Sequence, residues 1–130
     1  MQVEVVLTFC TAINCLDGRA QLPVISYLTR RFGVEFVDVV SEAGPAGILA
    51  RNSESQGSRS IFRRIDISIE AHQSRAIAIV AHHDCAGNTE PETEQIKELR
   101  QCVKILRKRY SNLPVIALWL DADRTAMEID

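Results

Sequence analysis

Residues 81–88, AHHDCAGN, place several side chains that can bind a metal within a few positions of one another. His82 and Cys85 are separated by two residues, and an imidazole nitrogen and a thiolate are both ligands that Zn²⁺ prefers in proteins. Adjacent side chains diverge, so we expect His83 and Asp84 to be exposed or to hydrogen-bond around such a site, with a proton-shuttle role as the alternative for His83. Because two ligands do not complete a zinc site, the others must come from elsewhere in the chain.

A second stretch with chemical potential is NCLDGR at residues 14–19, where Cys15 supplies another thiolate. Asp17 and Arg19 are two residues apart, so on an extended segment their side chains point the same way and can form an ion pair. The pair matters because Asp17 is also a candidate fourth zinc ligand. If Arg19 holds Asp17 instead, the fourth position stays open to water.

Hydrophobic patterning predicts the elements that must position these two stretches. Apolar runs rich in β-branched residues predict strands at residues 3–14, 34–41, 76–81 and 115–120. Apolar residues at helical spacing predict helices at residues 22–32, 59–73 and 92–110. The stretch AGPAG at 43–47 is predicted to be loop, with Gly44, Pro45 and Gly47 shaping a turn near the site. The polar residues 51–58 are predicted to be the most mobile, and the last residues to add a short edge strand.

The alternation of strands and helices predicts a single three-layer α/β/α domain over residues 1–130. Its sheet is expected to be mainly parallel, with four to five strands in the order 2-1-3-4 and right-handed connections. In such sheets, ligands bind beyond the carboxyl ends of the strands, where the strand order reverses. Both chemical stretches leave carboxyl ends, those of the first and third strands, so this order brings Cys15 to face His82 and Cys85.

Two thiolates and one imidazole form a plausible ligand set for tetrahedral Zn²⁺. Soft sulfur ligands favour zinc over magnesium or calcium, and two thiolates balance the charge of the dication. Three protein ligands plus water is the catalytic arrangement, in which zinc lowers the pKa of its water to about 7.

The combined pattern, Cys15-x-Asp17-x-Arg19 followed far downstream by His82-x-x-Cys85, resembles the signature of the β-class carbonic anhydrases. The stretch HHDCAGN is most similar to the small carbonic anhydrase-like members, and the resemblance runs through nearly the whole chain. It implies zinc held by Cys15, His82 and Cys85, and reversible hydration of CO₂ by zinc-bound hydroxide. Asp17 would orient that hydroxide while Arg19 holds Asp17, or Asp17 would move onto the metal and close the site. The resemblance also implies a homodimer or a higher homo-oligomer with the site near the subunit boundary.

The chain departs from the family pattern in several places. Ala86 follows Cys85 where the family usually has glycine, and Ser41-Glu42-Ala43-Gly44 stands where it tends to have an Arg-Asn-Ala-Gly-like stretch. We also expect no N-terminal helical arm. Glu42 is expected to place an acidic side chain near the metal, where it would affect substrate entry.

Three other functions fit the same residues. One is a hydrolase that acts on another small, CO₂-like electrophile. The second is a non-catalytic zinc-binding module in which Asp17 is permanently coordinated. The third is a thiol redox protein in which Cys15 and Cys85 form a disulfide.

Composition limits the classes of partner and the cell compartment that we expect. The chain has 130 residues, 46% hydrophobic and 25% charged, with a formal net charge of −2. This balance does not favour nucleic acid or an anionic membrane as a partner, and we expect a small-molecule substrate. Without a recognisable signal peptide, we expect a cytoplasmic protein with reduced cysteines. Cys10, Cys102 and Trp119 are expected to be packing residues, and the basic cluster at 104–109 a solvated helix end.

Overall fold

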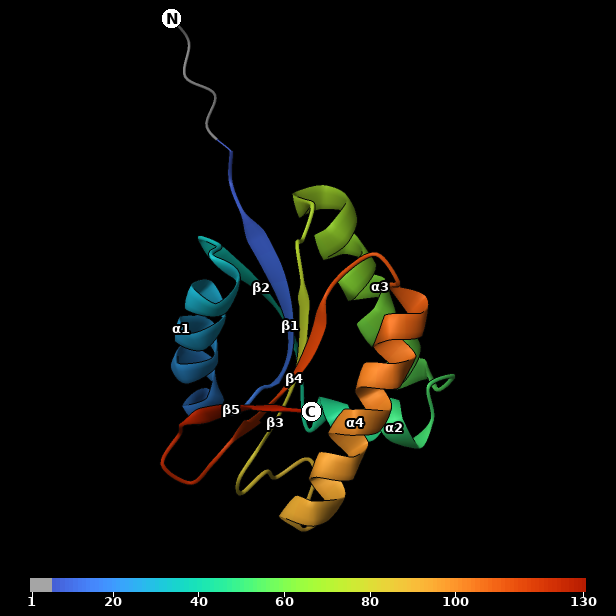
Figure 1. The fold of residues 1–130 in the computed structure, drawn as a ribbon. Coiled ribbons are helices and arrows are strands. Elements are labelled where there is room, and N and C mark those ends of the chain that lie inside the picture. The colour runs from blue at the N-terminus through green and yellow to red at the C-terminus, as the bar shows by residue number, and fades with distance from the viewer. Residues whose placement is uncertain (1–5) are drawn as a thin grey trace, which may run out of the picture.

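The computed structural model of this protein describes residues 6–130 and consists of one five-stranded sheet with helices on both faces (Figure 1). The strands are β1 (Phe9–Cys15), β2 (Phe36–Glu42), β3 (Ile77–His82), β4 (Val115–Leu120) and β5 (Ala126–Ile129). The helices are the short 3₁₀ helix η1 (Gly18–Ala20), α1 (Gln21–Phe32), α2 (Pro45–Arg51), α3 (Gln56–His72) and α4 (Glu92–Arg109). None of the helices in the described part of the chain is long and apolar enough to cross a membrane.

The sheet has the order β2-β1-β3-β4-β5. The first four strands run parallel and β5 is antiparallel to β4. The predicted order 2-1-3-4, the mainly parallel sheet and the short edge strand are therefore confirmed. The reversal of strand order lies between β1 and β3, which pair directly through Thr11–Ile77, Ala12–Ala78 and Ile13–Ile79.

Two apolar layers hold the helices against the sheet. Alternate residues of β3 point to opposite faces, so Ala78 and Val80 pack under α1 while Ile77 and Ile79 pack under the helices of the other face. All six residues of β3 are buried, as expected for a parallel strand that is covered on both sides. Figure 1 shows α1 alone on one face and α2, α3 and α4 together on the other.

The prediction of a loop at residues 43–47 was wrong, because α2 begins at Pro45 and continues to Arg51. Proline is favoured in the first turn of a helix, where its missing N–H has no partner to lose and its φ is already set. The turn consists of Ala43 and Gly44, and the φ of +63° at Gly44 is in the left-handed region. The short glycine-rich pattern concealed a helix of only seven residues.

The remaining differences concern where elements begin. The first strand was predicted from residue 3; residues 3–5 lie outside the described part, and β1 begins at Phe9. The segment 51–58 contains the end of α2 and the first residues of α3, which begins three residues before the predicted 59. Its polarity has a structural reason: Ser55 caps α3 by accepting from the Ser58 backbone N–H at 3.1 Å, and the buried Ser58 hydroxyl donates to the Asn52 carbonyl at 2.7 Å.

Two isoleucines of α3 give a matched test of this packing. Ile65 is fully buried in the larger core, whereas Ile67 is 52% exposed on the same helix. We expect Ile65→Ala to lower the free energy of unfolding by about 2–5 kcal/mol because it leaves a cavity. Ile67→Ala, the control, should change it by about 0.5 kcal/mol or less. Urea unfolding of both variants measures this, and equal effects would contradict the assigned faces of α3.

Candidate metal centre

Three residues from the ends of two neighbouring strands form a cluster of potential metal ligands. Cys15 is the last residue of β1, His82 is the last residue of β3, and Cys85 lies in the loop that follows. Because β1 and β3 are parallel neighbours, their carboxyl ends meet at one edge of the sheet. One ligating atom from each of the three residues lies within 4.8 Å of the others, and the two sulfur atoms are 3.8 Å apart. The structure thus brings together the residues that the sequence analysis placed at a single site.

The imidazole of His82 is oriented to present one nitrogen to this cluster. Its Nδ1 lies 2.8 Å from the backbone carbonyl oxygen of His83, which can only accept, so Nδ1 carries the proton and donates. In the neutral imidazole, Nε2 is then the acceptor nitrogen. It is buried and has no hydrogen-bond partner among residues 6–130. A buried acceptor without a partner is costly, and a metal ion bound between Nε2 and the two sulfurs would satisfy it.

The chemistry of the thiols also fits a metal site. Burial, with the Cys15 sulfur beside it, raises the pKa of Cys85, so without a cation this thiol stays protonated. Zinc binds thiolates, and its double charge would favour their ionised form. Cys15, Cys85 and the other two cysteines are free thiols, so the structure contains no Cys15–Cys85 disulfide.

Cys10 and Cys102 lie away from the cluster. Burial raises the pKa of Cys10 to about 11 and that of Cys102 to about 12. The Cys102 thiol donates to the backbone carbonyl of Ala46 at 3.2 Å. Both cysteines are therefore buried, unionised packing residues, as the sequence indicated. Trp119, which is 2% exposed, is also a packing residue.

Asp17 and Arg19 form a tight ion pair in the loop that follows Cys15. The guanidinium of Arg19 donates from Nη2 to Oδ2 of Asp17 at 2.7 Å and from Nε to Oδ1 at 3.1 Å. The backbone N–H of Arg19 also donates to Oδ1, at 2.9 Å. These hydrogen bonds hold the pKa of the Asp17 carboxyl well below its usual range. Both carboxylate oxygens accept from Arg19, and Asp17 is not a member of the cluster formed by Cys15, His82 and Cys85.

Arg19 is also bound to the loop that carries Cys85. Its Nη1 lies 3.2 Å from Oδ2 of Asp84, and its Nη2 donates to the Asp84 backbone carbonyl at 3.1 Å. Asp84 has a φ of +58°, a left-handed conformation that aspartate tolerates better than most residues. Arg19 therefore joins the loop after β1 to the loop after β3. The sequence indicated hydrogen bonding or exposure for Asp84 but gave no sign of this partner.

The turn that follows β2 packs against the loop that carries Cys85. A Cβ atom added to Gly87 would lie 2.4 Å from the backbone carbon of Ala43, and one added to Gly44 would lie 2.7 Å from the backbone of Gly87. Only glycines allow these two chain segments to approach so closely. The predicted approach of the Gly44 backbone to the site is therefore observed. Behind it, the space between Cys15, His82, Cys85 and the start of α2 is too small to hold a water molecule.

Residues that the sequence analysis missed hold these loops in place. The side chain of the buried Asn88 donates to Glu98 of α4 at 2.9 Å and accepts from Arg51 of α2 at 2.9 Å. On the other loop, Gln21 donates to the carbonyls of Cys15 and Asp17 at 2.7 and 3.0 Å. A polar residue beside a motif is the only sequence signal for such roles, and many surface residues share it.

Glu42 is the acidic residue at one of the departures from the family pattern. It is the β2 residue opposite Cys15 in the sheet register, but its carboxylate forms an ion pair with Arg64 of α3. Arg64 therefore balances the charge of a carboxylate at the end of the strand that pairs with β1. His83 is exposed, and Ala86, also exposed, occupies the position next to Cys85.

The comparisons with known proteins concern the family and the fold. Residues 6–130 match the protein family described as "Putative carbonic anhydrase". The fold is similar to a carbonic anhydrase from Glaciozyma antarctica (TM-score 0.63, 12% identity, covering 93% of this chain and 81% of that one). It is also similar to one of two tetrameric β-carbonic anhydrases from Sordaria macrospora (TM-score 0.60, 11% identity, covering 96% and 82%). No curated protein sequence matches the chain.

The ion pair between Asp17 and Arg19 gives a pH-dependent prediction. A depressed carboxyl pKa means that charged Asp17 stabilises the folded state above about pH 4, the unfolded-state pKa, and that this stabilisation is lost as the pH falls further, toward the folded-state pKa. In zinc-free protein, we expect Arg19→Gln to raise the pKa of Asp17 toward about 3.9. Carboxyl NMR titration of the wild type and the variant measures the shift. An Asp17 pKa that does not change would show that Arg19 is not its cause.

The contact between the two glycine-containing turns gives a steric prediction. We expect Gly87→Ala to lower the free energy of unfolding by about 1–3 kcal/mol, because the new methyl group overlaps the Ala43 backbone. Gly18→Ala is the matched control, since a Cβ there meets nothing within 4 Å. Urea unfolding compares them. If Gly87→Ala is as stable as the control, the two turns do not touch in solution.

Proposed function

The chain belongs to the carbonic anhydrase-like family that matches residues 6–130, and on that premise we propose that it is a zinc enzyme that hydrates CO₂ reversibly. Cys15, His82 and Cys85 would hold the zinc ion. The mutual reach of their ligating atoms and the unpartnered Nε2 of His82 support this assignment. Bound there, zinc would supply a Lewis acid that lowers the pKa of a water molecule to about 7.

The observation that carries the proposal is the engagement of Asp17 by Arg19. With both oxygens of Asp17 bonded to Arg19, the aspartate lies outside the cluster, which has three potential ligands among residues 6–130. Three protein ligands with a fourth position for water or substrate is the arrangement of catalytic zinc sites. Asp17, kept ionised by Arg19, would accept a hydrogen bond and so orient the attacking oxygen, while Arg19 and Asp84 fix its position.

A second candidate function is a non-catalytic zinc-binding module. The absence of room for a water molecule between the cluster and the start of α2 favours it, because a closed site needs no space for substrate. In that case Asp17 would leave Arg19 and become the fourth ligand. Cobalt(II) substitution separates the two, since an open site binds added small anions and its visible spectrum changes, whereas a closed site does not respond.

We further propose that the protein forms a homodimer or a higher homo-oligomer. The Sordaria macrospora carbonic anhydrases of similar fold are tetrameric. In this chain, Leu16 and Leu22 flank the loop of Asp17 and are 63% and 78% exposed, which is unusual for leucine side chains so close together in sequence. Sedimentation velocity of the wild type and of Leu22→Gln tests whether this surface is the contact.

The function is tested by metal content and by rate on the same sample. We expect one zinc ion per chain, lost in Cys85→Ser, and catalysed CO₂ hydration in stopped-flow assays across about pH 7–9. Asp17→Asn should keep the zinc but lower the rate by about tenfold or more, because the orienting acceptor is lost. A fully zinc-loaded wild type with no rate above buffer would rule out the enzyme and favour the zinc-binding module.

A further inference from the structure

The loop between β3 and α4, residues 83–91, carries Cys85 but has no regular secondary structure of its own. Two arginines bind this loop, Arg19 through Asp84 and Arg51 through Asn88. Both arginine side chains are about half exposed, and hydrogen bonds of such groups compete with water, so each contributes little to holding the loop. A stronger hold on Cys85 must come from a buried group.

Gln95, in the first turn of α4, is such a group. It is 4% exposed, and its Nε2 donates to the backbone carbonyls of Asn88 at 3.1 Å and Glu90 at 2.8 Å. The backbone N–H of Asn88 donates in turn to the carbonyl of Cys85 at 3.3 Å. A short series of hydrogen bonds therefore connects α4 to Cys85, and a hydrogen bond in the protein interior is stronger than the same bond in water.

The amide of Gln95 has one orientation that fits the loop. Reversing it would place Oε1 against two carbonyl oxygens, which can only accept. In the observed orientation, Oε1 is buried and has no hydrogen-bond partner among residues 6–130. A buried acceptor without a partner costs stability. The two bonds to the loop, and not packing, therefore account for an amide side chain at this place.

Gln95 also separates the ligand cluster from a cavity beside it. Three residues, Cys85, Asn88 and Gln95, line both a small closed space and a cavity of about 450 Å³. The closed space is also lined by the other two potential ligands, Cys15 and His82, whereas the cavity is not. If the loop were released, a small molecule in this cavity would have a path to the sulfur of Cys85.

We infer that Gln95 is a positioning residue, which fixes the loop 83–91 so that the sulfur of Cys85 stays within reach of Cys15 and His82. The inference rests on the proposed function for the claim that Cys85 binds zinc. The hold on the loop itself does not require a metal, because both hydrogen bonds of Gln95 are made to the backbone. This permits one test without zinc and another with it.

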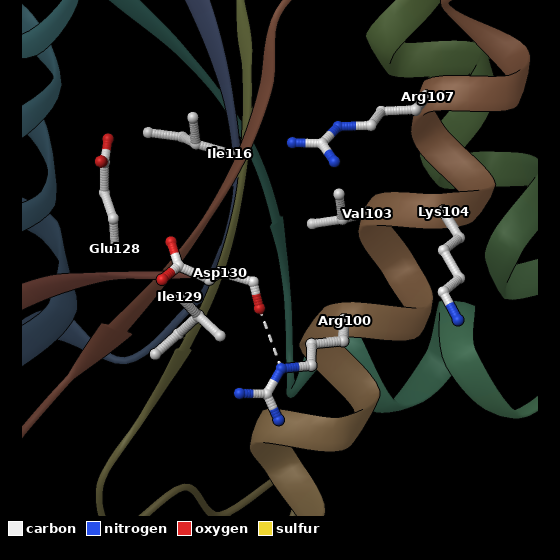
Figure 2. A pocket seen from close by; sticks show the side chains of 8 residues that line it. All are labelled: Arg100, Val103, Lys104, Arg107, Ile116, Glu128, Ile129 and Asp130. Atoms are coloured by element: carbon white, nitrogen blue, oxygen red, sulfur yellow. Dashed lines mark hydrogen bonds between the residues drawn. The ribbon is translucent and has the colours of Figure 1, made fainter.

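α4 is anchored to the sheet without Gln95, so the loop can be tested separately from the helix. Figure 2 shows Arg100 and Arg107 on the side of α4 that faces the strands, where each donates to a backbone carbonyl, at 2.9 and 3.1 Å. Cys102, on the same helix, is fully buried in the core. Replacing Gln95 should therefore release the loop and leave the helix in place.

Alkylation of the metal-free protein by iodoacetamide measures the hold on the loop, with each cysteine followed by peptide mass spectrometry. We expect Gln95→Met, which keeps a side chain of similar length but has no donor, to raise the rate at Cys85 by about tenfold. Cys102 is the internal reference on α4 and should stay unreactive. Gln101→Met is the matched control, because Gln101 is exposed on the same helix, and it should react like the wild type.

Two results of this experiment would overturn the inference. One is a Cys85 rate in Gln95→Met that equals the rate in the wild type or in Gln101→Met. The other is an equal acceleration of Cys102 and Cys85, both in Gln95→Met and in Gln95→Asn, which keeps the amide on a shorter side chain. Gln95 would then support the helix and not the loop.

Zinc binding to the same variants separates this inference from the proposed function. We expect Gln95→Met to bind zinc about ten- to hundredfold more weakly than the wild type in competition with a chelator, and Gln101→Met to bind it equally well. A wild type that binds no zinc would remove the proposed function, while the alkylation rates would still decide the role of Gln95. A released loop with unchanged zinc affinity would contradict the assignment of Cys85 as a ligand.

Discussion

The direct pairing of β1 with β3 is the constraint on which the candidate site depends. These strands are separated by more than sixty residues in sequence, and their parallel register fixes where each one ends. Since β1 ends at Cys15 and β3 at His82, the pairing alone delivers a thiol and an imidazole to one edge of the sheet. A slip of one residue in either strand would turn these side chains to the other face. The apolar residues packed on both faces of β3 oppose such a slip.

Hydrogen bonds from polar side chains connect the loops around the cluster to one another. Arg19 connects the loop after β1 with the loop after β3, and Asn88 connects the latter with α2 and α4. The contact between the turns at Gly44 and Gly87 adds the segment after β2. Three chain segments that are distant in sequence therefore hold one another. The charged members of this network are partly exposed, so their individual contributions to stability are expected to be small, and their main effect is on the position of Asp17.

Much of this arrangement could be predicted from the sequence, because its strongest signals are local and periodic. The apolar runs at 76–81 and 115–120 and the helical spacing at 92–110 gave β3, β4 and α4 within one residue of their observed ends. The motif residues gave the convergence of Cys15, His82 and Cys85, through the rule that parallel strands present their carboxyl ends together. Features that are short or that join distant residues could not be predicted. The glycine and proline of α2 concealed its helical pattern. The Asp84–Arg19 and Glu42–Arg64 ion pairs join residues that are far apart in the sequence and share no motif.

Cys15, His82 and Cys85 lie at the end of a sheet that is held by an apolar layer on each of its faces. This differs from small zinc-dependent domains, in which the metal supplies most of the folding free energy and the apo chain is unfolded. Here the burial of two apolar layers against the sheet offsets the entropic cost of bringing the ligands together. The binding free energy of a metal is then available for selecting the ion rather than for ordering the chain. Under the proposed zinc function, a protein built in this way would lose and regain its metal without unfolding, so the supply of metal, and not the folding of the chain, would set the fraction that carries the ion.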